Sequence, residues 1–367
     1  MSRYISKHTG KKIDDTIDNV VNPNLLDNWY FGNPVDQRGG RIVPPGTPYY
    51  TYGAETQVGT TSTYMTPLYA NDGAGHTVFI IEPGTGASCW VPESSLVRGY
   101  ILSSHAYGPD RWFGYTAWGA QPAVVLIEED GIRLTTYDIG LGSSSYAMLN
   151  QTFENLPDFI NKTVTLSVLV EETTPNDVGQ YPYIDLTSVE TYGTGSPIVL
   201  DKVGVLSKTM PFYSTAVHFS IYIPAGTTPS SVKIKAVKLE LGSQQTLAHQ
   251  DENGKWVLNE IPDFGEQLAK CQRYQLQTSS GRYAGNANAS EFYFFVPTPV
   301  SLRANPTLSG NYGTVVFADG STLTPTSIYA FATSANGVAC VATLPSPAPS
   351  ALAQIIDLNL LFDSNLN

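Results

Sequence analysis

Short apolar strands separated by glycine and proline turns constrain this chain more than any other feature. From Thr163 to Val170, apolar residues alternate with mainly polar ones, which predicts a half-buried strand. The stretch Val217–Ile223 repeats the pattern and ends at a Pro-Ala-Gly turn, and Ala123–Ile127 is a short apolar run after a proline. No helical periodicity interrupts these strands between Asn24 and Gly242. The chain is therefore predicted to be all-β, with an antiparallel sandwich over this region.

Composition narrows the classes of partner. The chain has 367 residues, enough for two separate cores, and only 14% of them are charged, so its surface has to be polar through Ser, Thr, Asn, Gln and Gly. The net charge of −12 argues against nucleic acid or anionic lipid, because both select basic patches. No run of 18 apolar residues predicts a membrane span, and the first twelve residues lack the apolar core of a secretory signal.

A joint between modules is predicted near residue 250. The apolar residues of Ser231–Leu241 change phase between Ala236 and Val237, which is typical of a β-bulge. After a polar linker, Asp263 and Glu266 stand three residues apart, as in a capping box. Three apolar residues at helical spacing then predict one buried stripe on a short helix: Phe264, Leu268 and Cys271.

Several blocks of sequence around this joint resemble phage tail fibres and tail-associated receptor-binding proteins. Those proteins carry a KxELG strand followed by a helix reading GEELAxCQRYY, and this chain has Lys238–Gly242 followed by Gly265–Tyr274. Three further blocks match in the same order: Asn24–Trp29 with Asn33–Gly39, Asp110–Trp112, and Glu154–Leu156 with Lys162–Leu166. The chain departs from the family pattern at Asp36 and at Gln275, where the family usually has Asn and Tyr. The blocks span roughly two-thirds of the chain and do not specify a ligand.

The resemblance implies an architecture and a location. The strands between residues 23 and 245 look like a jelly roll of the galactose-binding-like carbohydrate modules, and Trp112 would lie in its core. The family analogy implies a homo-oligomer, specifically a trimer, in the virion of a phage, in the tail, made in the cytoplasm of the bacterial host. Its partners would be other virion proteins and a host cell-surface polysaccharide.

The first 22 residues are predicted to form a separate module. Four β-branched residues recur at helical spacing before Asn22-Pro23 ends the helix: Ile13, Ile17, Val20 and Val21. A helix of about ten residues is marginal by itself in water, so its apolar stripe requires a partner. We expect identical helices around a symmetry axis, serving oligomerisation and attachment to the particle. The alternative is a helix folded back over the sandwich.

The sequence shows no residue spacing typical of a catalytic or metal-binding site. The five histidines have no HExxH spacing, and His218 is predicted to be solvent-facing or to contact a neighbouring strand. The cysteines Cys89, Cys271 and Cys340 have no metal-ligand spacing and are interpreted as buried reduced thiols. Two acidic pairs, Glu128 with Glu129 and Glu171 with Glu172, are interpreted as solvated turn charges rather than a hydrolytic pair. We expect no cofactor, no metal and no enzymatic activity.

Binding residues are easier to propose, because Tyr and Trp join a rigid apolar ring to a polar edge that suits sugars. Candidates lie in Tyr107–Trp118 and around Tyr181, with a third group in the C-terminal module that includes Asn286 and Asn288. The proposed ligand-binding residues are Tyr115, Trp118, Tyr181, Tyr183, Asp185, Tyr283 and Tyr293. For each of them, core packing or an oligomer interface is the competing interpretation.

The prediction is therefore four segments and a non-catalytic function. The segments are a helix at 1–22, a jelly-roll domain at 23–245, a linker with a short helix at 246–275, and a C-terminal β-sandwich head at 276–367. The predicted function is adhesion of a phage tail fibre to a host surface glycan. Two alternatives remain open: a purely structural head-fibre, neck or decoration protein, and a glycan-degrading depolymerase.

Overall fold

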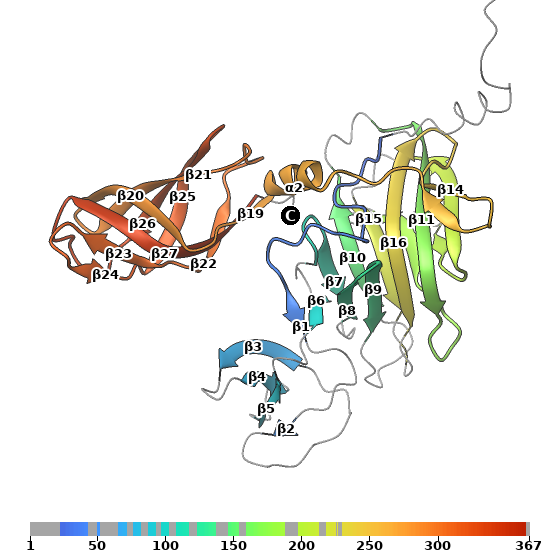
Figure 1. Ribbon diagram of the computed structural model, residues 1–367, viewed down its shortest axis with the longest axis horizontal. Helices are drawn as coiled ribbons and strands as arrows, with labels where there is room; N and C mark the ends of the chain where they lie inside the picture. The colour runs from blue at the N-terminus through green and yellow to red at the C-terminus, as the bar shows by residue number, and fades with distance from the viewer. Residues whose placement is uncertain are drawn as a thin grey trace, which may run out of the picture. The chain divides into compact units, whose positions relative to one another are not determined.

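The computed structural model describes a protein that is predominantly β (Figure 1). The described residues are 23–42, 50–51, 65–71, 76–81, 87–92, 97–102, 108–116, 123–136, 146–153, 159–187, 197–212, 218–224, 226 and 230–364. All strand pairings among these residues are antiparallel, and α2 (Phe264–Gln272) is the helix among them. No described helix has the length and apolar character needed to cross a bilayer. The predicted helix with Ile13, Ile17, Val20 and Val21 lies outside the described residues.

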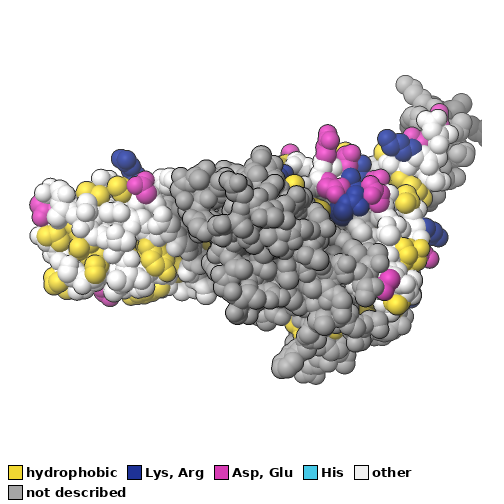
Figure 2. Space-filling model, turned by 90° about the horizontal axis from the view of Figure 1, so that it is seen from below, with side chains coloured by type: hydrophobic (Ala, Val, Ile, Leu, Met, Phe, Trp, Pro, Cys, Tyr) yellow, Lys and Arg dark blue, Asp and Glu magenta, His cyan; other side chains and the backbone are white. Residues whose placement is uncertain are grey.

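The chain divides into two compact units. The first comprises Met1–Pro34, Gly40–Gly108 and Trp112–Pro262, and the second comprises Val35–Gly39, Pro109–Arg111 and Asp263–Asn367. The longest stretch of the second unit begins at Asp263, inside the segment 246–275 that the sequence suggests as a linker. On the side of the molecule shown in Figure 2, charged side chains occupy few positions on the described surface.

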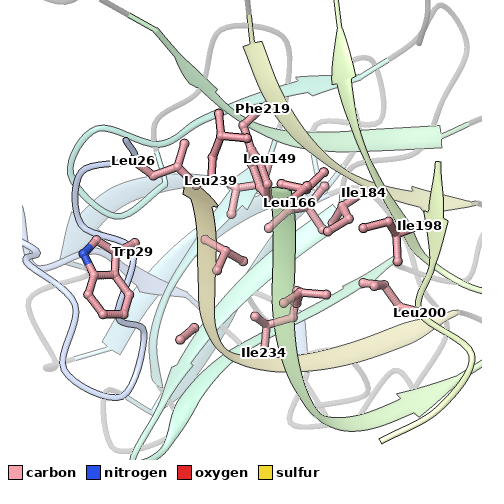
Figure 3. Packing of buried hydrophobic residues seen from close by; sticks show 14 of the residues in the cluster. Leu26, Trp29, Leu149, Leu166, Ile184, Ile198, Leu200, Phe219, Ile234 and Leu239 are labelled. Atoms are coloured by element: carbon pink, nitrogen blue, oxygen red, sulfur yellow. The ribbon is translucent and has the colours of Figure 1, made fainter. Parts of the chain in front are cut away.

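Two sheets build the first unit. The seven-stranded sheet has the order β1 (Arg41–Ile42), β6 (Val97–Leu102), β8 (Ala123–Glu128), β9 (Gly131–Thr136), β16 (Ser231–Leu241), β11 (Thr163–Thr174) and β14 (Gly204–Pro211). The five-stranded sheet has the order β13 (Ile198–Val199), β12 (Tyr183–Thr187), β15 (His218–Pro224), β10 (Tyr146–Thr152) and β7 (Phe113–Thr116). One apolar cluster contains side chains of both sheets, which places the core between them (Figure 3).

Trp112 lies in this core, as the resemblance implies. Its ring is fully buried, and it packs edge-on against Phe31 and Phe219 at centroid distances of 5.3 and 5.7 Å. Its indole nitrogen donates a hydrogen bond of 3.0 Å to the carbonyl of Asn28. A large ring that satisfies its only polar atom internally suits a core position.

The segment Asn24–Phe31 is joined to β16 by separate backbone hydrogen bonds and by the side chain of Asn24 instead of a regular ladder. The Asn24 amide oxygen accepts hydrogen bonds of 3.1 Å from the backbone N–H groups of Leu26 and Leu239, and its nitrogen donates to the carbonyl of Val237. Nearby, the Gln151 side chain forms two 2.7 Å hydrogen bonds with the backbone of Asp27. These amides satisfy backbone groups that an irregular segment leaves unpaired in a protein interior.

The strand β11 differs from its prediction. Residues Val164–Val170 are buried on both faces, including Thr165 and Ser167, so the strand is not half-buried. The cause is a later part of the chain: Thr246, Leu247 and Ala248 are themselves buried. They lead into a hairpin of β17 (Ala248–Gln250) and β18 (Trp256–Leu258), which packs against the cluster through Trp256 and Leu258. Residues 246–258 therefore form ordered structure that belongs to the first unit.

The bulge of β16 also lies elsewhere. The pairing with β11 joins Leu169 to Ala236 and Val170 to Ile234, so Lys235 is the extra residue. The predicted position between Ala236 and Val237 was wrong. The phase change itself is present, because Ile234 and Val237 pair with the core residues Val170 and Val168 of β11, but it is centred on Lys235.

A further antiparallel sheet lies within the region 40–100, for which the sequence suggests loops and short hairpins. Its order is β2 (Tyr50–Thr51), β5 (Ala87–Pro92), β4 (His76–Ile81) and β3 (Met65–Asn71).

The second unit is built around β27 (Leu352–Asp363). The sheet follows the order β24 (Thr322–Leu323), β23 (Thr314–Phe317), β27, β20 (Gly281–Asn288), β21 (Glu291–Pro297), β26 (Gly337–Thr343) and β25 (Ser327–Ser334). The second half of β27 pairs with β19 (Gln275–Gln277) and β22 (Thr307–Asn311) instead. Asp357, with φ of 56°, lies where the partners of β27 change. A separate apolar cluster fills this unit.

The helix α2 starts as predicted but buries a different stripe. Asp263 is its N-cap, and its carboxylate accepts a 3.0 Å hydrogen bond from the N–H of Glu266. The buried residues are Gln267 and Cys271, four apart on one face, whereas Phe264 is exposed. The predicted stripe was wrong at Phe264 because the first helical turn precedes the part that packs.

Residues of three sequence blocks meet in the second unit. The carboxylate of Asp110 is buried and accepts hydrogen bonds from the backbone and side-chain nitrogens of Gln37. The Gln37 side chain also donates a 2.8 Å hydrogen bond to the carbonyl of Gln275. The guanidinium of Arg111 lies 3.5 Å from the ring centroid of Tyr274. Burial raises the pKa of Asp110 in spite of Arg38 nearby. The resembling blocks therefore have a structural role here.

Candidate functional site

The outer face of the five-stranded sheet brings together the sequence-predicted residues of the first unit. Strand register places Tyr183, Tyr222, Met148 and Tyr115 side by side across β12, β15, β10 and β7. The neighbouring row, shifted by one residue, contains Ile184, Ile221 and Leu149, which belong to the core. Successive residues of a strand point to opposite faces, so the tyrosine row lies on the face away from the core. We call this surface the tyrosine face.

Three tyrosines on this face contact each other. The rings of Tyr183 and Tyr222 are stacked, with centroids 4.4 Å apart and an interplanar angle of 10°. Tyr146 lies 5.4 Å from Tyr222 on a tilted plane. Tyr222 is buried, while Tyr183, Tyr115 and Tyr146 are only partly covered. Stacking fixes the ring planes, so the partly exposed rings are presented in a defined orientation.

A polar row runs beside the tyrosines. Asp185, Ser220 and Asn150 pair across three neighbouring strands, and all three are buried. Asp185 Oδ1 accepts a 2.8 Å hydrogen bond from the N–H of Leu186. Asn150 Oδ1 is buried and has no hydrogen-bond partner among the described residues. An unsatisfied buried amide oxygen is costly.

A third row contains His218. Its Nδ1 lies 3.0 Å from Thr152 Oγ1, and its ring packs edge-on against Phe113 at 5.7 Å. The predicted contact with a neighbouring strand is thus confirmed. Burial lowers the pKa of His218, so the ring is neutral near pH 7.

Tyr183 on the tyrosine face is also uncharged near pH 7. Burial, together with the charge of Asp185, raises the pKa of Tyr183 to about 12. Its hydroxyl therefore stays protonated and can donate a hydrogen bond at any physiological pH. Aromatic planes beside short polar side chains suit the C–H faces and hydroxyls of a sugar.

Three of the four acidic residues considered for hydrolysis are engaged in ion pairs: Glu128, Glu171 and Glu172. Glu171 and Glu172 lie within β11, so their interpretation as turn charges was wrong. Glu128 lies 2.6 Å from Arg133 Nε and 3.1 Å from Lys233 Nζ, and Arg133 also contacts Glu172 at 2.8 Å. Burial would raise the pKa of Glu128, but hydrogen bonds and charges of Arg133 and Lys233 outweigh it and hold the pKa below its usual range. A carboxyl with a lowered pKa is a poor general acid. The described residues contain no group of three or more metal-ligating side chains.

The other predicted residues are not all brought together. Tyr181 lies partly buried just before β12, and Trp118 lies outside the described residues. In the second unit, Tyr283 faces the core opposite Ile355, whereas Tyr293 is exposed on the other face of the sheet beside Asn286. The sheet therefore separates Tyr283 from Tyr293.

Sequence reasoning missed Tyr222, Ser220 and Asn150. The signal was present in β15, where Phe219, Ile221 and Ile223 indicated the core face. The intervening residues His218, Ser220 and Tyr222 necessarily share the opposite face. The pairing of β15 with β12 and β10 could not be read from the sequence.

Comparisons with known proteins add little. No known protein family matches this chain, and no curated protein matches it. A solved structure titled "Structure of PfGH50B" is 10% identical, with a TM-score of 0.25, over 56% of this chain and 38% of that one. A likeness this weak carries no argument about function.

Proposed function

We propose that this protein is a component of a phage tail fibre that binds a host surface glycan without cleaving it. The observation that carries the proposal is the tyrosine face, where Tyr183 and Tyr115 lie beside the buried polar row of Asp185 and Asn150. In this proposal the two partly exposed rings stack on sugar rings. The Tyr183 hydroxyl, which stays protonated, donates a hydrogen bond to a sugar hydroxyl beside them.

The proposal includes a jelly roll for the first unit. It is supported by the way successive strands alternate between sheets: β10, β12 and β15 belong to one, and β11, β14 and β16 to the other. In a carbohydrate-binding-like module of this kind, the outer face of one sheet is available to a ligand. The resemblance of the sequence blocks to tail-associated proteins supports a place in the virion, with a trimer as the assembly. Several weak sites held together then bind by avidity.

The test is binding of the full-length protein to host cells and to a glycan array. We expect Tyr183→Ala to weaken binding per site roughly two- to tenfold, because an aromatic contact contributes about 0.5–1.5 kcal/mol. Tyr183→Phe keeps the ring and should retain the stacking part of the affinity. Phe264→Ala removes an exposed aromatic from α2 and should leave binding unchanged.

Tryptophan fluorescence checks that the Tyr183 and Tyr115 variants are folded, and circular dichroism checks Phe264→Ala, which lies in the second unit. Binding that survives Tyr183→Ala combined with Tyr115→Ala would refute the site. If the wild-type protein binds neither cells nor glycans, the adhesion function itself is refuted.

A further inference from the structure

The five-stranded sheet that carries the tyrosine face is acidic and has no cation of its own. Among the described residues of β7, β10, β12, β13 and β15, Asp185 is the one carboxylic acid, and none is a lysine or arginine. His218 adds no positive charge near pH 7, because burial lowers its pKa. The charge that these strands contribute is therefore negative.

Asp185 belongs to the same face as the tyrosines. It follows Tyr183 by two residues on β12, and its partner Ser220 precedes Tyr222 by two residues on β15. Alternate residues of a strand share a face and lie about 7 Å apart. Burial and the charge of Asp185 together raise the pKa of Tyr183, so this charge acts at the ring on which a sugar would stack. Because Asp185 is buried, its charge is screened less than that of an exposed carboxylate.

The sequence around these strands lacks cations as well. None of the 20 lysines and arginines falls in residues 112–132, 134–161, 163–201 or 209–232, which contain all five strands and most of the residues that flank them. Asp and Glu occur in the first three of these ranges. Proteins bind carboxylates and phosphates mainly through Arg and Lys. The strands of this sheet and their flanking residues therefore offer no such group to an acidic ligand.

We infer that the tyrosine face binds an uncharged stretch of polysaccharide and discriminates against one that carries carboxylate or phosphate groups. This inference rests on the proposed function, since it names the class of glycan for the same site. A neutral sugar offers C–H faces to the rings of Tyr183 and Tyr115 and a hydroxyl to the Tyr183 hydroxyl, so it requires no cation. An acidic sugar in the same place brings a like charge close to Asp185, and the net charge of −12 adds repulsion at longer range. Repulsion of the wrong ligand is a common source of specificity.

The test compares the full-length protein on matched pairs of oligosaccharides: galactose with galacturonic acid, glucose with glucuronic acid, and mannose with phosphorylated mannose. The neutral member of a pair should bind at least about tenfold more tightly, because like charges about 7 Å apart repel by more than this factor at an effective dielectric constant of about 20. Asp185→Asn keeps an oxygen that can accept from the N–H of Leu186, and it should lower the neutral-to-acidic ratio at least about fivefold. Glu171→Gln removes the same charge from the seven-stranded sheet and should change the ratio less than about twofold, because the partly exposed carboxylate of Glu171 is screened.

Salt dependence tests the same point on host cells with the wild-type site intact. The part of the binding that Tyr183→Ala removes should stay constant or rise between about 50 and 500 mM NaCl, because salt screens repulsion. Three outcomes overturn the inference and leave adhesion standing: Tyr183-dependent binding that falls with salt, tighter binding of the acidic members, or an unchanged ratio in Asp185→Asn. Absence of all binding to cells and oligosaccharides refutes the proposed function itself, so the two failures are distinguishable.

Discussion

The buried ion pair of β16 gives the sharpest test of how the first unit is held together. Lys238 and Glu240 lie on the outer face of the seven-stranded sheet with side chains 2% and 0% exposed, and their charged atoms are 3.6 Å apart. Thr246 joins them: Lys238 Nζ donates to its hydroxyl at 2.8 Å, and the hydroxyl donates to Glu240 Oε2. The N–H of Thr246 donates to Glu240 Oε1 at 2.8 Å. The lysine and glutamate of the KxELG block thus fix the segment that covers β11.

Removing one charge should be costly. In Glu240→Gln, the ammonium of Lys238 stays buried without its partner. In the native protein, burial already lowers the pKa of Lys238, although the negative charges of Glu240 and Glu260 oppose that shift. Breaking a buried pair in this way costs about 3–5 kcal/mol of unfolding free energy. Lys238→Met should cost near the lower end, about 3 kcal/mol, because the carboxylate keeps both hydrogen bonds from Thr246.

Removing both charges should cost much less. In Lys238→Met combined with Glu240→Gln, no charge is buried and the glutamine oxygen still accepts from Thr246, so we expect a loss within about 2 kcal/mol. The sum of the single losses, about 6–8 kcal/mol, then exceeds the loss in the double variant by at least about 4 kcal/mol. Glu171→Gln is the control on the same sheet. The ion pair of Glu171 with Lys235, at 3.8 Å, is partly exposed, so it should contribute less than about 1 kcal/mol to the free energy of unfolding.

The assay is urea unfolding followed by tryptophan fluorescence. All five tryptophans of the chain, at positions 29, 90, 112, 118 and 256, belong to the first unit, so the signal reports that unit alone. Urea is preferred to guanidinium because a salt screens the interaction under test. Single losses below about 1 kcal/mol, or losses that simply add in the double variant, would refute the reasoning.

Two further predictions concern titration and reactivity. Burial lowers the pKa of His218 below its unfolded value near 6.5, so the unfolded chain takes up a proton first as pH falls, and the first unit should lose stability from about pH 6.5 downward. His218→Gln should flatten this slope; an unchanged slope would contradict it. Cys271 and Cys340 are buried, and burial raises the pKa of the Cys340 thiol to about 12. Both should react with a thiol reagent only after unfolding, and rapid native labelling of either would contradict the packing.

The sequence predicted the β content and the inner faces of the strands, because alternation is a local property. The N-cap Asp263 and the core face of β15 follow from neighbouring residues, whereas the core position of Trp112 was implied by the resemblance. What covers an outer face is not local. Ser167 looks like a solvent-facing residue in its own strand, and it is buried because residues 246–258 return over the sheet. The side chain of Asn24 accepts a hydrogen bond from the backbone of Leu239, more than 200 residues later in the chain, and no periodicity indicates that contact.

Two outer faces of this protein are therefore covered differently. On the seven-stranded sheet the chain covers itself, and the buried charges of Lys238 and Glu240 are tolerated because they pair with each other and Thr246 hydrogen-bonds both. On the five-stranded sheet, Tyr183 and Tyr115 remain partly exposed beside a buried polar row, and this is the surface that we propose for a glycan. The raised pKa of Tyr183 keeps its hydroxyl neutral, so a ligand can cover this face without burying a charge on that ring.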